Sequence, residues 1–140
     1  MKRLTMNSML AAAAVVLAAS SASAQSLKAD VPFTFHAAGV VMTPGTYEIR
    51  NGSKTAKFVV LRNTDTKNSV LIVYSSEDVS KELKFRGTPS IAFECSGARC
   101  AIRELWKGPG NDSYRFHEPK PGSDGDTRMA MIPLTVGKAD

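Results

Sequence analysis

The chain has 140 residues, 43% of them hydrophobic and 22% charged, and its formal net charge is +5 at neutral pH. This length suits a single domain. The positive excess is too mild to indicate nucleic-acid binding, which we therefore do not expect, although it favours solubility and loose attraction to anionic surfaces.

The amino-terminal residues have the three parts of a secretory signal peptide. Residues 2–3 are basic, residues 9–19 are apolar, and residues 22–24 have the small-x-small pattern of a cleavage site. The apolar stretch is too short to cross a bilayer, which needs about 20 residues. We therefore predict a signal peptide at residues 1–24, cleaved after Ala24, and a secreted or periplasmic location.

Cleavage would leave residues 25–140, which we expect to fold as a single β domain. The loss of Lys2 and Arg3 lowers the formal net charge from +5 to +3. No later apolar run is long enough to span a membrane. In an oxidising compartment the two cysteines, Cys95 and Cys100, should form a disulfide.

The first part of the mature chain predicts two strands and a turn. Residues 31–36 alternate, with apolar side chains inward, and Pro32 restricts this strand to an edge or a strand start. Thr43-Pro44-Gly45 has the composition of a turn. Residues 46–50 alternate again and predict the next strand.

Two further segments, residues 57–61 and 69–74, are apolar on both faces. Such strands are typically central and covered on both sides, which favours a sandwich or a closed barrel over an open single-faced sheet. Residues 83–86 alternate once more and predict a short strand. The stretch 76–83 has room for one helical turn at most.

The stretch 91–106 predicts a β-hairpin around the short loop 96–99. In a symmetric register Cys95 faces Cys100, and Phe93 faces Ile102 on the same side. Directly opposite residues of an antiparallel pair are close enough for a disulfide. Its main effect would be to fix the register, since a one-residue slip turns every side chain to the other face.

Glu104 does not fit the alternation of this hairpin. Strict alternation puts it on the same face as Cys100, Ile102 and Trp106. Either a bulge after Arg103 re-aims it, or it lies at the sheet margin, or it is a buried functional carboxylate.

The carboxy-terminal part predicts a mobile surface loop at about residues 108–127, rich in Gly, Pro, Asp, Asn and Ser. Residues 114–116 within it predict a short strand, and residues 129–136 a last one, which Pro133 confines to an edge. The predicted fold is all-β, a small antiparallel β-sandwich or flattened β-barrel with one hairpin disulfide.

Three stretches together resemble a known family: Val31–Phe35, Thr43–Tyr47, and Phe85 through Trp106. The pattern V-P-F-x-F, then P-x-G-x-Y, a late Phe and L-x-E-x-W is similar to that of small secreted β-rich proteins of acidobacteria. These proteins occur in many copies per genome and have no assigned function. Two cysteines precede the last motif in some members.

The resemblance implies a secreted β fold and carries over no catalytic residue. This chain departs from the family pattern at residues 42–45, where Leu-Pro-Ala-Gly is usual, and in a longer connection at 87–91. The family positions would be Phe33, Phe35, Gly45, Tyr47, Phe85, Leu105 and Trp106.

We find no catalytic constellation, and expect no metal and no cofactor. His36 is predicted outward on an edge strand and His117 in a mobile loop, and no G-x-S-x-G elbow is present. Zinc binding by these histidines and the two cysteines has the wrong spacing, and calcium binding near residues 124–126 lacks the rest of its loop. The cysteine pair is not Cys-x-x-Cys, which favours a structural disulfide over a redox site.

Basic residues cluster in sequence around the hairpin, and Trp106 is nearby. With Glu104, the candidate ligand-binding residues are Arg86, Arg103, Glu104 and Trp106. We therefore expect a non-catalytic β protein acting by surface interaction in the cell envelope or outside the cell. The alternative is a carbohydrate or anionic-ligand binding module, whose partner would be an anionic polysaccharide or an envelope surface. The basic residues also have a simpler explanation, because charges on outward strand positions keep the edge of a sheet soluble and prevent it from pairing. The basic cluster comprises Lys81, Lys84, Arg86, Arg99, Arg103 and Lys107.

Overall fold

A computed structural model describes residues 25–52, 55–122 and 126–138. The predicted signal peptide, residues 1–24, lies outside the described residues. Among the described residues no helix is long and apolar enough to cross a membrane.

The described part of the chain forms eleven strands and one short helix. Their bounds are β1 (Gln25–Val31), β2 (Phe35–Ala37), β3 (Val40–Met42), β4 (Gly45–Asn51), β5 (Phe58–Asn63), β6 (Ser69–Glu77), α1 (Lys81–Arg86), β7 (Ser90–Ser96), β8 (Arg99–Trp106), β9 (Ser113–Phe116), β10 (Thr127–Pro133) and β11 (Thr135–Lys138).

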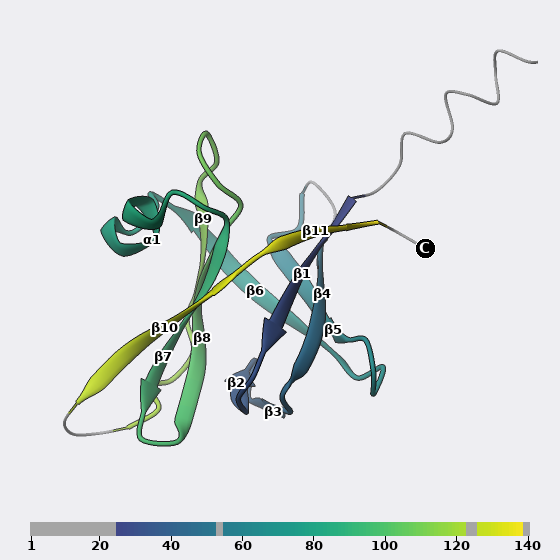
Figure 1. Cartoon of the computed structure of the whole chain (residues 1–140), viewed down its shortest axis with the longest axis vertical. Helices are drawn as coiled ribbons and strands as arrows, with labels where there is room; N and C mark the ends of the chain where they lie inside the picture. The colour runs from purple at the N-terminus through teal and green to yellow at the C-terminus, as the bar shows by residue number, and fades with distance from the viewer. Residues whose placement is uncertain (1–24, 53–54, 123–125, 139–140) are drawn as a thin grey trace, which may run out of the picture.

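Nine of these strands follow one hydrogen-bonded path, β10-β7-β8-β9-β6-β5-β4-β1-β11, and the pairs along it are antiparallel. The other two lie off this path, where β2 pairs with β3 in antiparallel and with β8 in parallel. The sheet bends so that β7, β8 and β10 form one layer and β1, β4 and β5 the other, with β6 crossing between them (Figure 1). The two end strands, β10 and β11, are separated in the chain only by Leu134 and run diagonally from one layer to the other. The all-β fold predicted from the sequence is confirmed.

Aromatic side chains fill the space between the two layers. Phe35 lies between Tyr47 and Phe93, with ring centroids 5.2 Å and 5.0 Å away, and both contacts are edge-to-face. All three rings are at most 1% exposed. Aromatic pairs in this geometry add to the free energy gained by burying their area. The inward positions predicted for residues 31–36 therefore lie against the core.

The central hairpin has the predicted register. Cys95 pairs with Cys100 and Phe93 with Ile102, and a disulfide joins the two cysteines, whose Cα atoms are 4.0 Å apart. Both half-cystines face the core. The disulfide thus joins β7 to β8 on the side of the sheet that faces the core.

The prediction that residues 57–61 and 69–74 are covered on both faces is wrong. Both segments are central, as β5 and β6, but their side chains alternate between buried and solvent-facing positions. Leu71 and Val73 on β6 are 50% and 67% exposed. These strands are therefore apolar on both faces, but only the inner face is covered.

The strand predicted at residues 83–86 is also wrong, because this segment is the helix α1. The Ser80 side chain accepts a hydrogen bond from the Leu83 backbone N–H at the helix start. Gly87 ends the helix with φ 71°, a left-handed conformation suited to glycine. Leu83 is fully buried whereas Phe85 is 93% exposed, as expected for residues two apart on a helix.

Two other predicted boundaries change. The predicted strand at residues 31–36 is interrupted after Val31, where β1 ends, and resumes at Phe35 as β2. β1 itself, from Gln25, was not predicted. The short strand expected inside the loop at 108–127 is confirmed as β9, and residues 123–125 of that loop lie outside the described residues.

Substitution on α1 distinguishes the helix from the strand that the alternation predicted. Leu83→Ala should lower the free energy of unfolding by about 2–4 kcal/mol, because it removes a fully buried side chain. Phe85→Ala, the matched control, should change it by less than about 0.5 kcal/mol. Urea unfolding followed by tryptophan fluorescence measures both. Similar losses for the two variants would indicate that both side chains face the same way and would contradict the helix.

Removal of the disulfide should have a modest effect on stability. The double variant Cys95→Ala/Cys100→Ala should lose about 2 kcal/mol, because the closed loop is short and little chain entropy is removed. Denaturant unfolding of the variant, compared with the wild-type protein before and after reduction, measures the loss. No change in either comparison would show that the bridge does not stabilise the fold.

Candidate binding groove

A β-bulge in β8 sets the position of Glu104. Ala92 pairs with Glu104 and the next residue, Phe93, pairs with Ile102, so Arg103 is the extra residue of β8. Ile102 faces the core, and after the bulge Glu104 faces the opposite side of the sheet, with Ala92. The predicted bulge is therefore present.

Helix α1 covers this outer face, so Glu104 is nevertheless buried, at 5% exposed. Its Oε2 accepts hydrogen bonds from the Ser80 backbone N–H at 3.1 Å and from the Ser113 hydroxyl at 3.0 Å. Its Oε1 lies 3.7 Å from Nη2 of Arg115. A buried carboxylate is stable only with such partners. The bulge and the buried carboxylate, considered as alternatives from the sequence, thus occur together.

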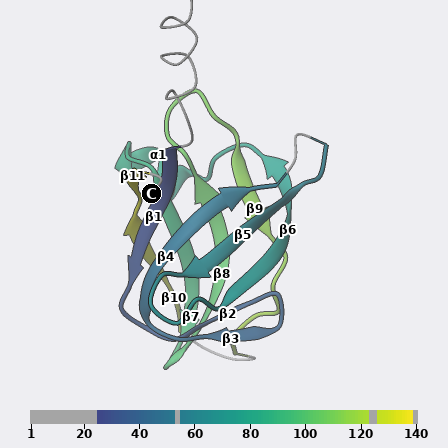
Figure 2. The ribbon, with the colours of Figure 1, turned by 90° about the vertical axis from the view of Figure 1, so that its right-hand side faces the viewer.

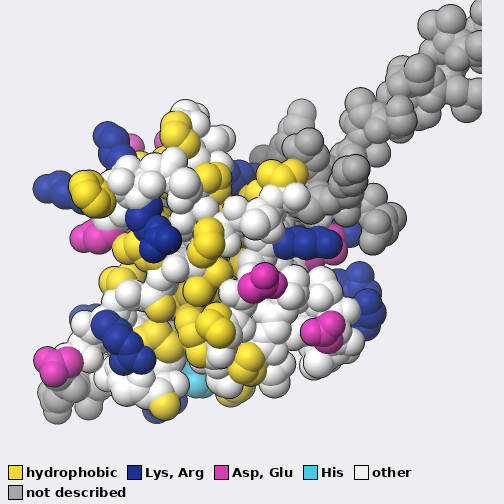
Figure 3. All heavy atoms as spheres, in the orientation of Figure 1, with side chains coloured by type: hydrophobic (Ala, Val, Ile, Leu, Met, Phe, Trp, Pro, Cys, Tyr) yellow, Lys and Arg dark blue, Asp and Glu magenta, His cyan; other side chains and the backbone are white. Residues whose placement is uncertain are grey.

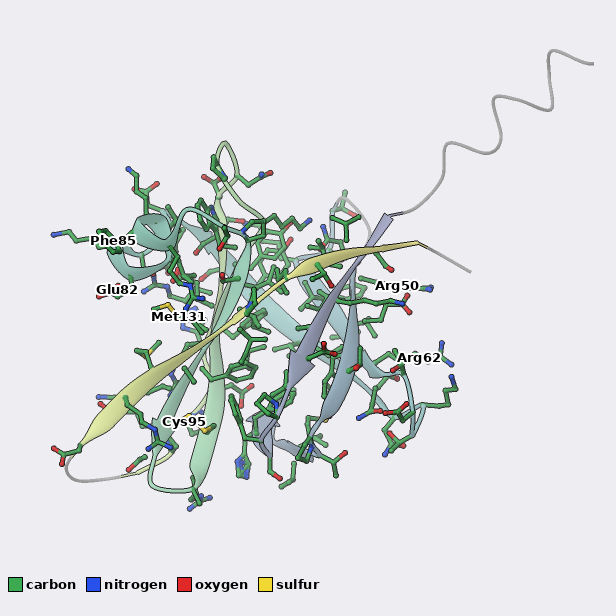
Figure 4. The ribbon with its side chains drawn as sticks, viewed as in Figure 1. Arg50, Arg62, Glu82, Phe85, Cys95 and Met131 are labelled. Carbon is green, nitrogen blue, oxygen red and sulfur yellow. A yellow bond between two sulfur atoms is a disulfide. The ribbon has the colours of Figure 1, made fainter. Side chains whose placement is uncertain are left out.

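A groove of about 490 Å³ lies on this outer face, beside α1. Ala92, Met129 and Met131 give it an apolar floor, and carboxylates of Glu82, Glu94 and Glu104 lie along it. Glu82 and Met131 are both on the α1 side of the β7–β10 layer (Figure 4). The lining residues are Ser80, Glu82, Ala92, Glu94, Arg103, Glu104, Arg115, Phe116, His117, Glu118, Lys120, Met129 and Met131.

The far wall of the groove, residues 117–120, is held by Arg103. The Nε of Arg103 donates to Oε2 of Glu94 at 2.6 Å, Nη1 donates to the Glu118 carbonyl, and Nη2 donates to the Pro119 carbonyl. Each nitrogen of this guanidinium therefore has a protein partner. Arg103 therefore positions the wall of the groove, and its hydrogen-bond donors are already used within the protein and not directed to an anionic ligand.

Arg115 plays a similar role at the other side of Glu104. Its Nε lies 3.0 Å from Oε2 of Glu77, and its Nη2 faces Glu104. Arg103 is thus held by hydrogen bonds, and Arg115 by ion pairs with two carboxylates. Lys120, which is exposed, is the remaining cation of the lining. The carboxylates of Glu82 and Glu118 remain beside it, because those of Glu94 and Glu104 pair with the two arginines. The groove therefore presents acceptors for a ligand's hydrogen-bond donors.

The structure brings together only two of the four predicted ligand-binding residues. Arg103 and Glu104 both line the groove, but Arg86 does not. Trp106 is only 3% exposed and packs with Leu83 and Ala92 under α1, where its Nε1–H donates to the Asn111 carbonyl. This indole supports the helix and presents no stacking surface to a ligand.

The basic residues that cluster in sequence lie on several elements. Lys81, Lys84 and Arg86 lie on α1, and Arg99 lies at the start of β8 next to the hairpin turn. Lys107 lies over the Tyr114 ring, 5.0 Å from its centroid. On the face shown in Figure 3, Lys and Arg side chains are spread out and do not form one patch.

The two histidines are on separate elements. His36 is half-buried in β2, whose pairing with β8 is parallel, and His117 is exposed with its Nε2 3.0 Å from the Ser75 hydroxyl. Within the described ranges, no three His, Cys, Asp or Glu residues are arranged to hold a metal ion.

A pair of stacked tyrosines lies outside the groove, with ring centroids of Tyr74 and Tyr114 3.9 Å apart. Burial raises the pKa of Tyr74, and Tyr114 raises it further. Burial acts in the same direction on Tyr114, but the hydrogen bonds of Lys107, Tyr74 and Asn51 and the positive charge of Lys107 together outweigh it and lower the pKa of Tyr114. The pair contacts the core and Asn51, and it is a structural feature of this end of the sheet.

Sequence reasoning missed several groove residues. Met129 and Met131 were placed on an edge strand, and nothing in the sequence indicated that β10 would lie beside β7. Ser80, Ser113 and Arg115, which surround Glu104, come from three separate segments. The one available signal was the misfit of Glu104 in the hairpin alternation.

Comparison of this chain with family models, curated proteins and solved structures found no match. The resemblance to the small secreted acidobacterial proteins therefore stays a prediction.

Glu104 should be important for stability. Glu104→Ala leaves the Ser80 N–H and the Ser113 hydroxyl without their acceptor and should lower the free energy of unfolding by about 2–3 kcal/mol. Glu104→Gln keeps an acceptor oxygen and should lose less. Glu82→Ala, at an exposed position of the same groove, should change it by under about 0.5 kcal/mol. Equal effects of Glu104→Ala and Glu82→Ala in denaturant unfolding would contradict this account.

Proposed function

We propose that the chain is an exported, non-catalytic binding domain that holds a carbohydrate in the groove beside α1. The observation that carries this proposal is an apolar floor directly beside carboxylate acceptors. A sugar ring has an apolar C–H face and a rim of hydroxyl donors, and it would match both features. The volume, about 490 Å³, is within the range of small-molecule sites, about 300–1,000 Å³.

Among carbohydrates, the groove favours neutral sugars over the anionic polysaccharide considered from the sequence. The nitrogens of Arg103 are bound to Glu94 and to two backbone carbonyls. Arg115 is held between Glu77 and Glu104. Glu94 and Glu104 are themselves paired with these arginines, so the remaining lining charges are the carboxylates of Glu82 and Glu118 against Lys120, and their small net negative charge disfavours an anion.

The same contacts argue for binding without hydrolysis. Glycoside hydrolysis needs one carboxyl group to give a proton to the leaving oxygen and a second carboxylate to act as nucleophile or base. In the groove, Glu94 accepts from Arg103, and Glu104 accepts from Ser80 and Ser113. Both carboxylates serve as acceptors that hold the walls in place, and this structural role supports binding without hydrolysis.

The export part of the proposal rests on the signal-peptide pattern of residues 1–24 and on the disulfide. A bridged cysteine pair fits an oxidising, extracytoplasmic compartment. A role in the cell envelope or outside the cell, and membership of the family of small secreted β proteins, are part of this same proposal.

Binding to oligosaccharides tests the proposed function. Isothermal titration of the exported protein with a panel of neutral and acidic oligosaccharides should detect a neutral ligand. Met131→Ser and Glu82→Ala, which alter the floor and an exposed acceptor, should each weaken binding about tenfold or more, the loss expected for one good contact.

Phe85→Ala, on the same helix but outside the groove lining, is the matched control and should bind like the wild-type protein. Lack of binding to every oligosaccharide, or binding that survives both groove substitutions unchanged, would overturn the proposed function.

A further inference from the structure

The outer face of β5 and β6 carries an apolar patch that is independent of the groove. Val60 pairs with Leu71 and Phe58 pairs with Val73, so these four side chains, here called the β5–β6 patch, lie side by side on one face. Leu71 and Val73 are 50% and 67% exposed, and Phe58 and Val60 are half-buried. Figure 2 shows the layer of β4, β5 and β6 from this side.

The patch belongs to a rigid part of the molecule. The inward residues that alternate with it, Val59, Leu61 and Ile72, are at most 2% exposed. The Phe58 ring lies against Gly52, where an added Cβ would come within 2.5 Å of it. The four side chains are therefore presented by strands anchored in the core, and their exposure does not come from a loose loop.

Two arginines lie next to the patch on the same face. Arg50 of β4 pairs directly with Val60, and Arg62 follows Val60 two residues later on β5. Both side chains are on the outer side of this layer (Figure 4). Arg50 contacts Glu48 but its side chain stays 62% exposed, whereas that of Glu48 is 15% exposed. The exposed charge beside the patch is thus mainly positive.

We infer that the β5–β6 patch docks on an anionic lipid surface. Exposed apolar side chains beside arginines suit the boundary between acyl chains and negatively charged headgroups, where apolar burial and attraction to anionic lipids act together. A dimer in which two copies pack through this patch is the competing occupant, and the test below distinguishes it from the lipid surface.

Vesicle sedimentation tests this inference, independently of carbohydrate binding. The exported protein should sediment with vesicles of phosphatidylcholine and phosphatidylglycerol, and at least tenfold less with pure phosphatidylcholine. Binding to the mixed vesicles should weaken as salt is added, since salt screens exposed charges. Leu71→Ser/Val73→Ser and Arg50→Gln/Arg62→Gln should each weaken this binding at least fivefold.

Lys81→Gln/Lys84→Gln is the matched control, since it removes the same charge from α1, away from the patch. It should leave most of the binding intact. Circular dichroism and urea unfolding should show that all three double variants are folded. Three results would overturn the inference: no binding to anionic vesicles, an equal loss in the control, or a dimer in light scattering that Leu71→Ser/Val73→Ser abolishes.

Discussion

The bulge at Arg103 decides which side chains of β8 face the core and which face the groove. It lets one strand, β8, supply Ile102 and Leu105 to the core and Glu104 and Trp106 to the opposite face. Without the extra residue, regular alternation would place the Glu104 carboxylate among the aromatic side chains of the core, at a large desolvation cost. The disulfide lies on the same hairpin, between its turn and the bulge, and fixes the register there.

The outer face of this hairpin is organised by the groups that satisfy Glu104 and Arg103. Glu104 ties the start of α1 and the start of β9 to the sheet, and Arg103 ties the segment after β9 to Glu94. The groove lies between these two sets of contacts. Its walls are therefore held by buried or half-buried polar groups, which is the preorganisation that a binding site needs. The opposite layer has a different character, with exposed apolar side chains and, within the part of the chain that the structure describes, no helix over it.

Much of the fold could be predicted from the sequence, for identifiable reasons. Two cysteines five residues apart, flanked by apolar alternation, define the hairpin register without any tertiary information. The helix α1 was missed because Leu83 and Phe85 alternate like a strand. Ser80 before the segment and Gly87 after it are capping residues, and they indicate a helix more strongly than this short alternation indicates a strand. The exposure of Leu71 and Val73 was missed because apolar sequence does not show whether a sheet face is covered.

The candidate site was harder to predict than the fold. The misfit of Glu104 marked the right residue, and Arg103 also lines the groove. Trp106 belongs to the packing under α1, and the apolar floor comes from Met129 and Met131, which reach the groove only through the pairing of β10 with β7. Such a site depends on contacts between segments far apart in the chain, and no local pattern encodes them.

Nuclear magnetic resonance of ¹³C-methyl methionine labels would test the central claim most directly, that ligand binds on the floor of the groove. The described chain has Met129 and Met131 in the groove and Met42, 4% exposed, in the core. Titration with a bound oligosaccharide should shift the methyl signals of Met129 and Met131 and leave that of Met42 in place. Unchanged groove signals at saturating ligand, or an equal shift of Met42, would contradict the account.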